Sequence, residues 1–173
     1  MGLFDRFKRK GPEAPAAVAC DWEPLTVLSP VDGEAVALAD VPDEAFSQGL
    51  LGQGLAVRPS GRTVFSPVDG TVAALVGSGH AVGLETADGM QVLVHVGVDT
   101  VAMEGEGFTP YVSQGDAVRA GQPLLGFDPD AIAAADLPDE VMVLVSNAAD
   151  YDAVTPVAPG PVRAGERVVI LAR

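Results

Sequence analysis

The sequence has little of what several large classes of protein need. Only one of its 173 residues is cysteine, so Cys20 can form neither an internal disulfide nor a cysteine-based zinc site. Lysine is absent after Lys10, which leaves the rest of the chain without an attachment point for biotin or lipoate. No apolar run exceeds five residues, and the N-terminus lacks the apolar core of a secretory segment. We therefore expect a cytoplasmic protein without a membrane-spanning helix.

Basic residues are also scarce. The chain has 10 Lys and Arg residues against 24 Asp and Glu residues, a net charge of −14, which argues against nucleic acid as a partner. Four of the basic residues lie in Met1–Lys10, where Leu3, Phe4 and Phe7 would share one face of a short helix. This pattern favours equally a solvated tail and a weak contact with anionic lipids, which would hold the protein at the inner face of the membrane.

Glycine and proline are abundant, with 20 and 14 residues, while aromatic residues make up only 5% of the chain. Such a composition predicts many short strands joined by turns rather than a helical bundle. The chain divides into an amphipathic basic segment at 1–10, an Ala- and Pro-rich linker at 11–22 that we expect to be flexible, and a single folded domain at 23–173.

Two short motifs each occur twice. Ser29-Pro-Val-Asp-Gly33 returns as Ser66-Pro-Val-Asp-Gly70, and Val118-Arg-Ala-Gly121 returns as Val162-Arg-Ala-Gly165. Each copy is typical of a turn that leads into a strand. We therefore predict an all-β fold, an antiparallel sandwich of two related halves. One short helix is predicted at Asp128–Asp136, with Asp128 or Asp130 as its N-cap.

The two histidines of the chain flank a predicted β-hairpin. Strand-like runs at 81–86 and 91–96 are separated by a segment that contains Asp88-Gly89, a strong hairpin signal. With Asp88 and Gly89 as the two turn residues, His95 lies opposite Val82 and His80 is its diagonal neighbour, about 7–8 Å away. A slip of one residue would put the histidines on opposite faces of the sheet.

Two neighbouring imidazoles permit several kinds of chemistry. A neutral imidazole can attack a phosphoryl group and hold it as a phosphoramidate while its partner hydrogen-bonds the oxygens. Both rings can instead ligate zinc, with Asp99 or Glu85 as a further candidate ligand. The third interpretation is that both histidines are structural. From spacing alone, all three remain open.

Longer motifs add a resemblance to a known family. Val94-His-Val-Gly-Val-Asp-Thr-Val101, Glu104-Gly-Glu-Gly-Phe108 and the opening MGLFD are similar to the glucose-type IIA component of the bacterial sugar phosphotransferase system. The similarity also includes Val41-Pro-Asp-Glu-Ala-Phe46 and Val145-Ser-Asn147 and spans nearly the whole chain. The fold implied is a duplicated hybrid motif, a barrel-like sandwich with one or two short helices.

The resemblance implies a role for each residue of the histidine site. His95 is the residue phosphorylated, on Nε2, and His80 orients the phosphoryl group. Ser78 supplies a hydroxyl beside His80, and the Gly97 carbonyl takes the Nδ1 proton of His95. The implied activity is a phosphotransferase that accepts a phosphoryl group from phospho-HPr and passes it to a cysteine of a IIB domain attached to a membrane permease.

The resemblance also implies a shallow, partly apolar face on which partners dock, here named the predicted rim. Its residues are Phe46, Val76, Val82, Leu93, Val96, Asp43 and Asp99. No cofactor is required, although relatives share a zinc ion with a partner protein through both histidines. A regulatory module that binds transporters or kinases is the first alternative, and a zinc-dependent hydrolase of the lysostaphin type is the second.

Overall fold

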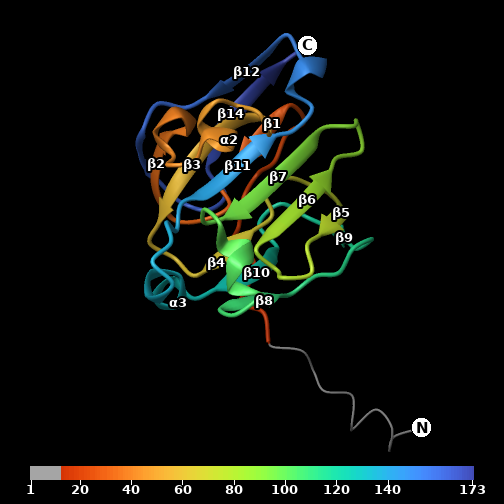
Figure 1. Cartoon of the computed structure of the whole chain (residues 1–173). Helices are drawn as coiled ribbons and strands as arrows, with labels where there is room; N and C mark the ends of the chain where they lie inside the picture. The colour runs from red at the N-terminus through yellow and green to blue at the C-terminus, as the bar shows by residue number, and fades with distance from the viewer. Residues whose placement is uncertain (1–12) are drawn as a thin grey trace, which may run out of the picture.

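The structure, a computed structural model, describes residues 13–173, so the basic segment at 1–10 and the first two linker residues lie outside the described residues. Most of the described chain is short β-strands (Figure 1). The strands are β1 (Thr26–Leu28), β2 (Gly33–Ala37), β3 (Gln53–Pro59), β4 (Thr63–Phe65), β5 (Gly70–Leu75), β6 (Ala81–Glu85), β7 (Gln91–Val96), β8 (Phe108–Pro110), β9 (Ala117–Val118), β10 (Pro123–Phe127), β11 (Val141–Val145), β12 (Ala153–Pro156), β13 (Gly160–Val162) and β14 (Arg167–Ala172).

The strands form one large and two small sheets, and every pairing is antiparallel. The large sheet has the order β13-β2-β3-β11-β7-β6-β5-β9, and the small sheets have the orders β1-β14-β12 and β4-β10-β8. Neither small sheet closes on the large one to make a barrel within residues 13–173. The prediction of an all-β antiparallel sandwich is confirmed.

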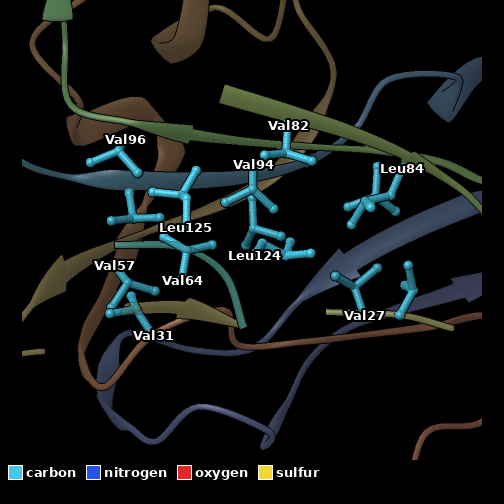
Figure 2. Close-up of a cluster of buried hydrophobic side chains, with 14 of the residues drawn as sticks. Val27, Val31, Val57, Val64, Val82, Leu84, Val94, Val96, Leu124 and Leu125 are labelled. Carbon is cyan, nitrogen blue, oxygen red and sulfur yellow. The ribbon is translucent and has the colours of Figure 1, made fainter. Parts of the chain in front are cut away.

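The main core lies between the large sheet and the two small ones. Figure 2 shows Val82 and Val94 of the large sheet above Leu124 of β10, with Val27 of β1 lower in the view and in the same cluster. Aliphatic side chains supply nearly all of this packing, in keeping with the shortage of aromatic residues. The core therefore holds the large sheet rigid without occupying its outer face.

Strand β11 is the centre of the large sheet and is buried on both faces. It pairs with β3 on one side and with β7 on the other, and all five of its residues are buried. Val141, Val143 and Val145 pack into the main core, whereas Met142 and Leu144 belong to a second apolar cluster. Since alternate residues of a strand face opposite ways, the second cluster covers the outer face of the sheet. It is next to this outer cluster that His95 lies.

The repeated motifs bind one another in a nested pattern. Asp32, in the first Ser-Pro-Val-Asp-Gly copy, accepts a hydrogen bond from Ala164 N at 2.8 Å, in the second Val-Arg-Ala-Gly turn. Asp69, in the second copy, accepts one from Ala120 N at 2.7 Å, in the first turn. The first copy of one motif thus contacts the second copy of the other, and the second copy contacts the first. This reciprocal contact explains why both motifs are duplicated.

The end of the predicted linker lies against the domain. Val18 N donates to Gly121 O at 3.0 Å, and Trp22 Nε1 donates to Thr26 O at 2.9 Å. A side chain at Gly121 or Gly165 would collide with Val18 or Cys20, so both Val-Arg-Ala-Gly turns receive this segment. Contacts with the domain therefore begin before Glu23, at Val18.

The predicted register of the histidine hairpin is wrong by one residue. His95 pairs with Ala81, not Val82, because Glu85 pairs with Gln91 and leaves a longer loop between the strands. Inside that loop Thr86 N donates to Met90 O, and the Thr86 hydroxyl accepts from Met90 N, which adds residues to the expected two-residue turn. The shift does not separate the histidines, since His80 precedes the first residue of β6, where strand alternation no longer decides the direction of a side chain.

Helices are few and short in the described chain. They are α2 (Glu44–Ser47) and α3 (Pro129–Ala134), with the 3-10 turns η1 (Leu38–Asp40), η2 (Thr100–Met103) and η3 (Ala148–Asp150). The helix predicted at 128–136 is α3, and its cap is Asp128, whose side chain accepts from Asp130 N at 3.0 Å. Helix α2 has a similar cap, Asp43, and places Phe46 over the outer face of the large sheet.

Candidate active site

Strand β7 sets the position of His95 through simple alternation. Val92, Val94 and Val96 are buried in the main core, so Leu93 and His95 face the opposite way, toward the outer cluster. Alternation along 91–96 is thus enough to separate His95 from the three valines.

The His95 ring is fixed by the turn that follows its strand. Nδ1 lies 2.8 Å from Gly97 O, and because a carbonyl can only accept, Nδ1 carries the proton. Gly97 has φ of 75°, a left-handed conformation in which a side chain would also overlap Thr100. The proton on Nδ1 leaves Nε2 of His95 with its lone pair available.

His80 is held by a second local contact. Its Nδ1 lies 2.6 Å from Ser78 Oγ, across the turn in which Gly79 has φ of 74°. The Phe108 ring, 6.2 Å away between centroids, packs edge-on against the imidazole. His80 is consequently almost fully buried, at 5% exposed, whereas Ser78 is partly open to solvent.

The two imidazoles meet edge to face. Their centroids are 4.8 Å apart and the ring planes make an angle of 79°. The Phe46 ring from α2 lies 5.1 Å from that of His95 on another side. The structure thus brings His80, His95, Ser78 and Gly97 together, as the sequence predicts.

Burial makes both histidines poor bases. It lowers the pKa of His95 to about 4, with a further lowering by His80, while the Gly97 hydrogen bond and the Asp43 and Asp99 carboxylates act in the opposite direction. Burial also lowers the pKa of His80. Both rings are therefore neutral near pH 7, the form in which imidazole is a nucleophile.

The predicted rim is found only in part. Val76 is exposed, Leu93 is partly exposed, and Phe46 touches His95 but is itself buried. Val82 and Val96 do not belong to the rim, because both are fully buried in the main core. The resemblance placed them there, whereas Val82, paired with Val94, and Val96 face the main core together with Val94.

The two predicted rim acids differ in their surroundings. Asp43 caps α2 by accepting from Ala45 N at 2.7 Å, so part of its role is structural. Asp99 is exposed and has φ of 59°, a strained conformation for a residue with a side chain. Both carboxylates act on the pKa of His95, which places them close to its ring.

Sequence reasoning missed two exposed apolar residues on segments that follow site residues in the chain. Leu50 is 71% exposed and its amide donates to Ala45 O, directly after α2, while Val101 is 62% exposed in η2, directly after Asp99. Together with Val76 they leave large aliphatic side chains in water on three segments that lie next to site residues in the sequence. An apolar residue inside a glycine-flanked turn, as at Leu50, is the pattern that points to such exposure.

The donor atoms suit part of a zinc site but not a whole one. Among residues 13–173, no group of three or more His, Cys, Asp or Glu side chains converges. Glu85, a candidate ligand, pairs with Gln91 at the far end of β6 from His95. Two imidazoles can supply half of a tetrahedral zinc site, so the remaining ligands would come from another molecule. A zinc hydrolase needs a third ligand from its own chain, and this arrangement does not offer one.

Comparison with known proteins agrees with this geometry. Residues 25–151 match the family described as phosphoenolpyruvate-dependent sugar phosphotransferase system, EIIA 1. The chain belongs to this family. The matched residues include both histidines, Ser78 and Gly97.

Within the described residues, no helix has the length and apolar character needed to cross a membrane.

Members of the EIIA family similar to this chain occur in two arrangements. The mannose-specific EIIBCA component of Corynebacterium glutamicum is 48% identical over 129 residues, which cover 75% of this chain and 19% of that protein. The chain thus spans about a fifth of the length of such fused relatives. The glucose-specific EIIA component of Oceanobacillus iheyensis is 37% identical over 146 residues, 84% of this chain and 88% of the relative.

A solved structure supports the fold directly. The glucose permease IIA from Mycoplasma capricolum superimposes with a TM-score of 0.80 at 33% identity, covering 84% of this chain and 94% of the other.

Proposed function

We propose that this chain is a phosphocarrier that accepts a phosphoryl group on Nε2 of His95 from phospho-HPr and passes it to a cysteine of a IIB domain. One observation carries the proposal: Nδ1 of each ring has a local hydrogen-bond partner, which leaves both Nε2 atoms for a phosphoryl group. The Gly97 carbonyl keeps the proton of His95 on Nδ1, and we assign the Ser78 hydroxyl as donor to Nδ1 of His80, which puts the proton of His80 on Nε2. One Nε2 is thus a nucleophile and the other a hydrogen-bond donor.

The transfer follows from these two nitrogens. The Nε2 lone pair of His95 attacks phosphorus while the phosphorus–nitrogen bond of the donor phosphohistidine breaks and its electrons return to the donor ring. His95 becomes a cation whose Nδ1–H stays bonded to Gly97 O. The Nε2–H of His80 donates to a phosphoryl oxygen. In the second step a cysteine thiolate attacks phosphorus, and the bond to His95 breaks.

The surroundings of the site suit partners that meet briefly. Leu50, Val76 and Val101 are exposed aliphatic side chains that a partner can cover, and Asp43 and Asp99 add negative charge near His95. A small surface permits rapid separation after transfer. The names of the EIIBCA relatives state that their EIIA parts share a chain with IIB and IIC parts, which supports a IIB acceptor here. We place the transfer in the cytoplasm, where thiolates of partner proteins remain reduced.

A regulatory use of the same two nitrogens is the second candidate. No metal is needed for the transfer, but His80 and His95 fit half of a zinc site. A partner that supplied the other ligands would give zinc a structural role in the complex and would block phosphorylation. Loss of zinc-dependent binding on phosphorylation is the property that distinguishes this regulatory use.

Variants of the two histidines test the proposal. His95→Ala removes the nucleophile and should abolish labelling by phosphoenolpyruvate, enzyme I and HPr. His80→Gln keeps a side-chain donor and should still accept the phosphoryl group but pass it to IIB poorly. Intact mass spectrometry under alkaline conditions measures both. Labelling that survives in His95→Ala and vanishes in His80→Gln would show that the roles are reversed.

A further inference from the structure

The Gly97 carbonyl decides which nitrogen of His95 carries the proton, so something must hold that carbonyl in place. Glycine itself does not, because it visits positive and negative φ with nearly equal ease. Gly97 has φ of 75° and its carbonyl lies 2.8 Å from Nδ1 of His95. The neighbours of this turn must therefore supply the constraint.

One side of the turn is tied to the segment before β11. Gly97 N donates to Glu140 O at 2.8 Å, and Val98 N donates to Pro138 O at 3.1 Å. The first bond holds the N–H end of the peptide between Val96 and Gly97, and the second holds the N–H end of the peptide that carries the Gly97 carbonyl. The other end of the first peptide, the Val96 carbonyl, is left to be held from elsewhere.

Thr100 holds that carbonyl. Its side chain is fully buried, and its hydroxyl donates to Val96 O at 2.5 Å. Its methyl group fills the space that a side chain at Gly97 would need. The turn that carries Thr100 is bracketed by Asp99 and Glu104, with φ of 59° and 53°. Residues with side chains stay in such conformations only where their surroundings over-determine them.

We propose that Thr100 is a positioning residue for phosphoryl transfer: its hydroxyl keeps the Gly97 carbonyl on Nδ1 of His95 and thereby keeps Nε2 unprotonated. The proposal rests on the phosphocarrier function and adds a residue that touches neither the phosphoryl group nor the partner. Thr100 is fully buried and acts on the nucleophile through Val96 and Gly97, so its hydroxyl makes no contact with a docked partner.

Two variants separate the hydroxyl from the packing. Thr100→Val keeps the shape and removes the hydroxyl, whereas Thr100→Ser keeps the hydroxyl. Thr26→Val is the matched control, because buried Thr26 makes the same kind of bond, to Glu23 O at 2.5 Å, in β1. Long-range ¹H–¹⁵N NMR of the full chain gives the His95 tautomer, and stopped-flow transfer from phospho-HPr gives kcat and KM.

In Thr100→Val we expect a mixture of His95 tautomers and a fall in kcat of about 10-fold, the factor that corresponds to the net contribution of one hydrogen bond, with KM unchanged. Thr100→Ser and Thr26→Val should keep the Nδ1–H tautomer and most of the rate. A wild-type tautomer and rate in folded Thr100→Val would overturn the proposal, as would an equal slowing in Thr26→Val. Failure of the wild type to accept a phosphoryl group would refute the proposed function instead, and the tautomer comparison would still decide the role of Thr100.

Discussion

Burial of His95 should make the stability of the domain depend on pH in a particular window. The perturbation is His95→Gln, which keeps a polar side chain of similar reach but cannot take up a proton. In the folded protein burial lowers the pKa of His95 to about 4 from an ordinary value of 6.5. Between those values the unfolded chain binds a proton that the folded chain does not. Stability therefore falls as the pH drops from about 6.5 to about 4.

The magnitude follows from the size of the shift. One pKa unit corresponds to about 1.4 kcal/mol, so protonation of unfolded His95 costs the wild type about 3 kcal/mol between pH 7 and pH 4. Carboxylates titrate in part of this range in both proteins. The useful quantity is therefore the difference in unfolding free energy between the wild type and His95→Gln.

Urea unfolding at pH 7, 6, 5 and 4 measures that difference. As the pH falls from 7 to 4, we expect the unfolding free energy of His95→Gln to rise by about 3 kcal/mol relative to that of the wild type. Most of this change should occur below pH 6.5. A companion NMR titration should show the His95 ring still neutral at pH 5. Parallel pH curves for the two proteins, or a ring that protonates near pH 6.5, would refute the reasoning from burial.

Two further substitutions test the backbone geometry and the repeats. Gly97→Ala forces a side chain into a left-handed turn against Thr100 and should destabilise the domain by about 2 kcal/mol. Urea unfolding measures this loss, and a variant as stable as the wild type would contradict the described turn. Asp32→Ala and Asp69→Ala each remove one of two equivalent hydrogen bonds and should each cost about 1 kcal/mol, which thermal unfolding would show as a Tm drop of about 2–4 °C. A large loss in one variant and none in the other would contradict the nested equivalence of the halves.

Sequence patterns predicted the features that depend on local chemistry. The duplicated Ser-Pro-Val-Asp-Gly motif indicated two related halves, because each copy carries its own turn and strand. Alternation in 91–96 separated His95 from the three valines that face the core. The cap at Asp128 was also visible, since an acidic side chain before an alanine-rich run satisfies free helix amides.

Features that depend on distant pairing were not predictable in the same way. The hairpin register was wrong by one residue because Thr86 and Met90 add hydrogen bonds inside the loop that no turn motif announces. Val82 and Val96 were placed on the rim by resemblance, although alternation along 91–96 already turns Val96 toward the core, and the structure shows both buried. The nested contacts of Asp32 and Asp69 join residues far apart in the chain, so repetition revealed the motifs but not their partners.

The position of the phosphoryl group on the ring tests the central claim most directly. The chain is phosphorylated with phosphoenolpyruvate, enzyme I and HPr at alkaline pH and examined by ³¹P NMR with ¹⁵N-labelled histidine. Coupling of a single phosphorus to Nε2 of His95 is the result predicted, because Nδ1 of that ring is bonded to Gly97 O. Phosphorus on Nδ1 of His95, on His80, or on neither histidine while HPr itself is phosphorylated would contradict the account.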